Sequence, residues 1–180
     1  MKKLINFKLV SLAVFCLLLL AVEADAQRRT KKRAPQPKAA ATSAANKNAA
    51  EIKAGATRVG EQIKILTQFV YVLGGIRKDI EAIDAAAKTN KATRAAVQQN
   101  EVTKKGVIAS IANVRAGLQK LEADFKANPA LQFYSISLLA VNDLAATAEQ
   151  QANSNQFDQS GRTMIQAVAQ LTDVLLSMQK

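Results

Sequence analysis

The side chains in this sequence that could do chemistry are mostly carboxylates. Asp79, Glu81 and Asp84 lie close together, and Glu122 and Asp124 form a second group further along the chain. Carboxylates on facing helices can hold a pair of metal ions, but such sites normally also take His from Glu-x-x-His pairs. The chain has no His, and lysines flank both acidic groups. We therefore expect these acids to form ion pairs on a solvated face, and we predict no metal site.

The residue types that are missing exclude several classes of enzyme. Without His, Ser-His-Asp and Cys-His nucleophiles cannot form, and the commonest general base is absent. Neither G-x-x-x-x-G-K-[ST] nor G-x-G-x-x-G occurs, so the common phosphate-binding loops are missing too. Tyr71 and Tyr134 lie in apolar stretches, where packing is the expected role. We predict a protein that is not an enzyme and that needs no cofactor.

The first 26 residues are typical of a secretory signal peptide. Three lysines open the chain, and an uncharged apolar run follows at residues 9–22. That run is shorter than the ~20 residues that span a bilayer as a helix. Small residues at Ala24 and Ala26 match a signal-peptidase site, so cleavage is predicted after Ala26. The expected location is secreted or periplasmic.

Two alternatives to a cleaved signal peptide stay open. One is an uncleaved anchor, for which residues 9–22 would have to form a short tilted span. The other is a lipoprotein modified at Cys16, although Phe15 stands where a lipobox requires a small residue. The basic residues directly after Ala26 also disfavour export in bacteria, because positive charge beyond an apolar run opposes translocation.

Residues 27–48 form a basic tail. They include seven basic residues, no acidic residue and no large apolar side chain. Pro35 and Pro37 favour extended backbone, and nothing in the segment can bury enough apolar surface to offset the entropy of ordering. We predict that this tail is disordered. Its candidate residues for binding an anionic surface are Arg28, Arg29, Lys31, Lys32, Arg33 and Lys38.

The expected partner of this tail is an anionic membrane surface or a cell-envelope polymer. The alternative is that the tail is a solvated linker that keeps the rest of the chain away from its surroundings. Nucleic acid is disfavoured as a partner if the chain is exported, and the tail has no aromatic residue on which a base could stack.

Residues 49–180 are predicted to be helical throughout. Apolar residues from Ile52 to Leu73 recur at alternating spacings of four and three, which is the pattern of a coiled-coil seam. Gly74 and Gly75 interrupt this pattern, which then resumes at Ile76. We favour one long helix over 49–88 with a kink at the glycines. The alternative is a turn there and five shorter helices.

Three further helices complete the predicted fold. The second covers about 89–127, with a break near Asn100 left open. Asn128 is the expected N-cap of the third helix, and Asp158 that of the last. Ala56 and Gly60 suit a close approach between helices. The sequence predicts an all-α fold, an antiparallel up-and-down bundle of about four helices, with self-association through helical seams left open.

The segment 63–76 is apolar on two sides of the predicted helix, because a second row of apolar residues, called here the second ridge, runs from Ile65 to Ile76 beside the main seam. A helix of this kind usually packs against two neighbours, which would make the segment core. Alternatively the second ridge is an apolar contact surface for protein clients or ligands, formed by Ile65, Phe69, Val72 and Ile76. The sequence therefore favours an exported, non-enzymatic protein with a binding or structural role. The alternative is a periplasmic chaperone-like holdase or a carrier of apolar ligands.

Overall fold

The computed structural model describes residues 37–179, with side chains described from Ala45 onward. This part of the chain contains four α-helices and no strand. The helices are α2 (Pro37–Lys88), α3 (Arg94–Ala127), α4 (Gln132–Asn153) and α5 (Phe157–Ser177). The predicted signal peptide and residues 27–36 of the predicted tail lie outside the described residues.

Helix α2 is 52 residues long and runs without a break through Gly74 and Gly75. The apolar seam on both sides of the glycines explains this continuity, since packing outweighs the ~1 kcal/mol that each glycine costs inside a helix. The helix begins at Pro37, twelve residues before the predicted start at residue 49. The structure thus places residues 37–48, expected to belong to the tail, in the first turns of α2. Proline suits a first helical position, and the alanines after it favour helix.

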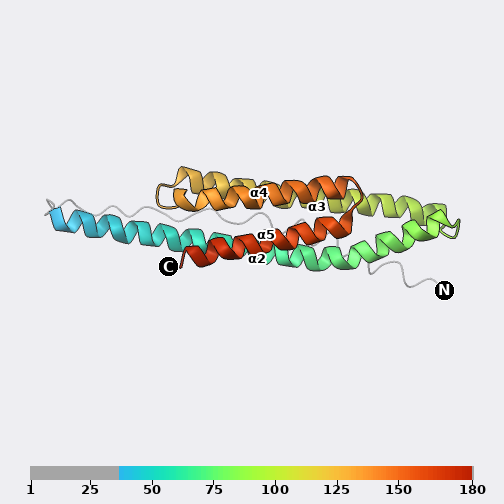
Figure 1. Ribbon diagram of the computed structural model, residues 1–180, viewed down its shortest axis with the longest axis horizontal. Helices are drawn as coiled ribbons and strands as arrows, with labels where there is room; N and C mark the ends of the chain where they lie inside the picture. The colour runs from blue at the N-terminus through green and yellow to red at the C-terminus, as the bar shows by residue number, and fades with distance from the viewer. Residues whose placement is uncertain (1–36, 180) are drawn as a thin grey trace. The chain divides into compact units, whose positions relative to one another are not determined.

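The four helices form an antiparallel bundle in which each helix packs against two others (Figure 1). Helices α2 and α4 each lie between α3 and α5, so the chain goes up and down around the bundle in sequence order. The interior is one apolar cluster with contributions from all four helices. Its fully buried members include Leu66, Ile111, Phe125, Leu138 and Leu171.

Helices α2 and α3 are longer than their partners and extend beyond them. Near its start, α5 contacts α2 through Asp158, which pairs with Arg77 at 2.9 Å. Beyond this point α2 packs against α3 alone, and Ile80 is buried between them. We call the two-helix projection beyond Arg77, residues 78–104, the arm (Figure 1). At the opposite end, the first turns of α2 project alone past the other three helices.

Two predicted helix caps differ from the structure. Asn128 is the C-cap of α3, not the N-cap of α4, which begins only at Gln132. Its side-chain oxygen accepts the N–H of Ala130 at 3.0 Å, which forms the turn between the two helices. Asp158 lies inside α5, where its carboxylate pairs with arginines instead of capping. Asn128 thus stabilises the turn after α3, and Asp158 forms ion pairs near the start of α5.

The close approach between helices occurs at Gly55, not at the predicted Gly60. A Cβ at Gly55 would lie 2.7 Å from Leu131 Cδ2 and 2.9 Å from Met178 Cε, whereas a Cβ at Gly60 would meet nothing within 4 Å. Gly55 thus lets α2 pack closely against the start of α4 and the end of α5.

Candidate functional site

The predicted basic surface lies mostly outside the described residues. The five cations from Arg28 to Arg33 precede the described part of the chain. Lys38 falls in the second residue of α2, and its side chain is not among those described. The binding surface proposed for these six residues therefore stays a prediction.

The predicted apolar contact surface is divided by the structure. Phe69 belongs to the core, with 6 % of its surface exposed, and Ile76 is half-buried against that core. Ile65 and Val72 are 38 % and 49 % exposed. The division arises because α2 packs against α3 on one flank and α5 on the other. Of the residues in this predicted surface, Phe69 therefore faces the core and Val72 faces solvent.

A regularly spaced set of exposed apolar residues lies on α4. Phe133, Ile136 and Leu139 are 79 %, 69 % and 43 % exposed, and they recur every third residue in its first turns. We call these three residues the α4 patch. The Phe133 ring meets Tyr134 edge-on, with the ring centroids 5.5 Å apart. The sequence carries a signal for this patch, because all three residues lie off the buried stripe that includes Leu131, Leu138 and Val141.

Carboxylates singled out in the sequence form ion pairs, as the sequence predicts. Glu81 pairs with Arg77, and Asp84 with Lys104. Glu122 pairs with Lys126, and Asp124 with Arg58 of the neighbouring helix. Within residues 37–179, no three acidic or cysteine side chains gather closely enough to hold a metal ion.

The two tyrosines have different surroundings. Tyr134 is half-buried and packs against the core, as its apolar context predicts. Tyr71 is 85 % exposed, so the packing role predicted for it is wrong. It lies on the outer side of α2, whose inward positions in this region are taken by Phe69 and Leu73.

A polar cluster lies between α2 and α3 in the arm. Asn100 and Lys104 occupy buried positions of α3 that continue the spacing of its apolar seam. The Asp84 carboxylate accepts from Asn100 Nδ2 at 2.7 Å and from Lys104 Nζ at 2.8 Å. Glu101 accepts a second bond from the Lys104 ammonium at 2.9 Å.

Opposing effects act on the Lys104 ammonium, whose side chain is 10 % exposed. Burial lowers its pKa, but the hydrogen bonds and negative charges of Asp84 and Glu101 outweigh burial, and the net pKa lies above the ordinary 10.5. Lys104 therefore stays charged at neutral pH. An ammonium held in this way stabilises the pairing of two helices and is not prepared for nucleophilic or base chemistry.

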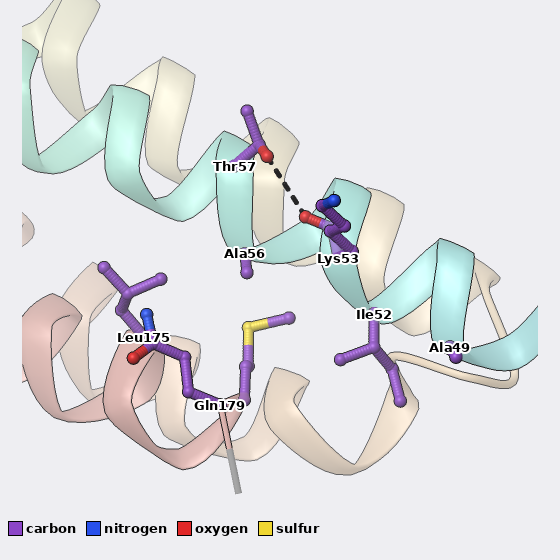
Figure 2. A pocket seen from close by; sticks show the side chains of 8 residues that line it. Ala49, Ile52, Lys53, Ala56, Thr57, Leu175 and Gln179 are labelled. Carbon is purple, nitrogen blue, oxygen red and sulfur yellow. Dashed lines mark hydrogen bonds between the residues drawn. The ribbon is translucent and has the colours of Figure 1, made fainter.

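An open groove lies at the other end of the bundle, where the last turns of α5 meet α2 (Figure 2). Its volume is about 550 Å³. Ala49, Ile52 and Ala56 of α2 face Leu175 and Met178 of α5 across it. Thr57 lies at its edge and donates to the Lys53 carbonyl at 3.1 Å. Five of the eight lining residues are apolar, and the polar ones are Lys53, Thr57 and Gln179, so the groove suits contact with an apolar segment better than catalysis.

Comparison with protein-family models, curated proteins and solved structures gives no match for this chain. Among the helices described, none is both long and apolar enough to cross a membrane. The proposals below therefore depend on the residues and their geometry alone.

Proposed function

We propose that this chain is an exported, non-enzymatic helical-bundle protein whose basic tail binds an anionic component of the cell envelope. The proposal is supported first by where the charge lies in the sequence. Residues 27–48 carry seven basic residues and no acidic one, whereas residues 49–180 carry 15 basic and 12 acidic residues. The excess positive charge is thus concentrated in one short segment.

The observation that carries the proposal is the pairing of cations within the bundle. Arg58, Arg77, Arg115 and Arg162 each pair with a carboxylate of the described chain. These arginines have their attraction for anions satisfied within the bundle, and residues 49–180 as a whole carry a net charge of only +3, from 15 basic and 12 acidic residues. The tail has no acidic residue of its own, so its cations are the natural contact for anionic lipids or envelope polymers.

The experiment compares two variants with the same change in charge, each starting at Gln27. One replaces Arg28, Arg29, Lys31, Lys32 and Arg33 with Gln. The matched control replaces five exposed bundle lysines with Gln, namely Lys64, Lys78, Lys91, Lys105 and Lys120. Co-sedimentation is measured with anionic vesicles, cell-wall sacculi and duplex DNA at low and high salt.

We expect the tail variant to lose about a hundredfold or more in affinity at low salt, because each cation near an anionic membrane contributes ~1 kcal/mol. The bundle variant should lose much less, and high salt should weaken the parent chain toward the tail variant. Equal losses in the two variants would refute a specific role for the tail. Binding to DNA alone would refute an envelope role.

The exposure of Ile65 and Val72 favours a second candidate function, a holdase or carrier that binds apolar segments. Phe69 is unsuitable for testing it, because a polar residue at a core position would unfold the bundle. The double variant Ile65→Ser, Val72→Ser should instead weaken dye binding and suppression of aggregation while the thermal unfolding midpoint changes little. Unchanged suppression of aggregation by this variant would eliminate the candidate.

A further inference from the structure

We propose that the α4 patch inserts into the surface of an anionic lipid bilayer and forms a second membrane contact in addition to that of the basic tail. This inference depends on the proposed function, because the tail's charges bring the chain to the bilayer. It goes beyond that function by naming lipid as the anionic partner and by assigning a contact to Phe133, Ile136 and Leu139.

The first argument is that the patch presents apolar groups to water without a partner among residues 37–179. Phe133 and Ile136 are 79 % and 69 % exposed in a helix whose other face is fully packed. The edge-on contact with Tyr134, itself half-buried, holds the Phe133 ring against a fixed neighbour. A large aromatic ring kept in water on a stable helix is typical of a contact site.

The size of the patch argues for lipid over a second protein. A stable protein interface buries about 800 Å² on each partner and needs 20 or more residues. Three side chains on one helix present far less than that. Insertion into lipid needs no complementary partner surface, so a few apolar side chains suffice when basic residues supply the rest of the binding energy.

The charge around the patch is compatible with an anionic bilayer. The first ten residues of α4 contain no acidic side chain, and Asp143 is the first acid along the helix. The acids nearest in sequence before α4, Glu122 and Asp124, are both paired with cations. No carboxylate beside the patch in sequence would therefore be pressed unpaired against anionic headgroups.

The position of the patch places it at the same end of the bundle as the start of α2. Glu51 of α2 accepts from Asn128 Nδ2 at 2.9 Å, and Asn128 stands just before α4. The first turns of α2, which include Lys38 and Lys47 of the basic tail, project from this end (Figure 1). The start of α2 and the α4 patch thus lie at the same end of the described bundle, which allows both to reach one surface.

The experiment uses the absence of tryptophan from the chain. Phe133→Trp places a single fluorescent reporter in the patch, and Tyr71→Trp places one at an equally exposed aromatic position elsewhere. Each chain, starting at Gln27, is titrated with vesicles of equal parts phosphatidylglycerol and phosphatidylcholine, and with pure phosphatidylcholine. We expect the Phe133→Trp emission to shift to the blue and to be quenched by brominated lipid on the anionic vesicles, whereas Tyr71→Trp should keep its emission in water.

Affinity provides the second readout. The double variant Phe133→Ser, Ile136→Ser should bind anionic vesicles about tenfold or more weakly than the parent, since each side chain loses its transfer into lipid. Because both residues are exposed, its thermal unfolding midpoint should match that of the parent. The matched control Tyr71→Ser should bind lipid like the parent.

The failures of the two proposals can be distinguished. A chain that binds anionic vesicles through its tail, with an unshifted Phe133→Trp spectrum and full affinity in the double serine variant, overturns the inference and leaves the proposed function standing. Binding to sacculi without binding to vesicles likewise overturns the lipid contact and leaves the proposed binding to the envelope standing. Vesicle binding that survives neutralisation of the tail, with the Phe133→Trp shift intact, instead overturns the tail's role and retains the patch as the lipid contact.

Discussion

At the scale of single residues, Gly55 and Gly60 offer the sharpest test of the packing. Both lie inside α2, so alanine at either position should gain about 0.5–1 kcal/mol from helix propensity and reduced chain entropy. At Gly60 the added Cβ meets nothing within 4 Å, and Gly60→Ala should therefore stabilise the protein by that amount. At Gly55 the Cβ would overlap Leu131 and Met178, and Gly55→Ala should destabilise by about 1 kcal/mol.

The measurement is the free energy of unfolding from urea titrations of the parent and the two variants. Equal stabilisation by both substitutions would show that Leu131 and Met178 move aside without cost. That outcome would contradict the tight contact between α2, the start of α4 and the end of α5.

At the scale of elements, the stability of the arm depends on Lys104. Its pKa is raised in the folded state, so the ammonium binds its proton more tightly folded than unfolded. The resulting stabilisation is complete below the unfolded pKa of 10.5 and is lost as pH rises through the higher folded pKa. Relative to Lys104→Met, which cannot titrate, the parent should lose about 1 kcal/mol of stability on passing above that range.

The check is chemical denaturation of both proteins from neutral to strongly alkaline pH. All other ionisable groups are common to both proteins, so their contributions cancel in the difference. The difference in free energy of unfolding between the parent and Lys104→Met should stay constant at lower pH and should change only above pH 10.5. A difference that is flat through the whole range would refute the role of the buried ammonium. Lys105→Met, at an exposed neighbouring position, is the control.

The elements also show how far the sequence alone could lead. The spacing of Val107, Ile111, Val114 and Leu118 predicts the buried face of α3, and the structure buries all four. The same spacing extends back to Lys104 and Asn100, but both are polar, so the sequence pattern does not mark them as buried. Only the geometry shows that Asp84 across the arm supplies their hydrogen bonds. Asp84 lies 16 residues before Asn100 and 20 before Lys104. A contact between residues so far apart in the chain has no local signature in the sequence.

The candidate sites show the same limit. Ile65, Phe69 and Val72 are equally apolar in the sequence, yet only Phe69 is core, because the choice depends on where α3 and α5 lie around α2. The α4 patch has no core-like periodic signal in the sequence, for the opposite reason. Phe133 and Ile136 lie off the buried stripe, and a search for periodic core residues passes over apolar side chains that do not fit the period.

At the scale of the whole molecule, the four-helix part of the bundle should resist trypsin while its two projections are cut. The first turns of α2 have no packing partner in Figure 1, and residues 45–50 are all exposed. An isolated helical segment of about 15 residues is marginally stable in water. At the arm's tip, Lys88 and Lys91 flank the turn at Asn90, whose φ of 56° marks a tight reversal.

We therefore expect early cleavage after Lys47 and within the turn at Lys88 and Lys91, and slow cleavage after Lys64 and Lys120. All five lysines are exposed, so side-chain access alone would predict equal rates. Trypsin must also unfold several residues locally, and Lys64 and Lys120 lie in helices packed on both flanks, where such opening costs much of the global stability. Mass spectrometry of a timed digest gives the order of cuts. Cleavage after Lys64 as early as after Lys47 would mean that α2 is no more stable inside the bundle than beyond it, which would contradict the packing of α2 between α3 and α5.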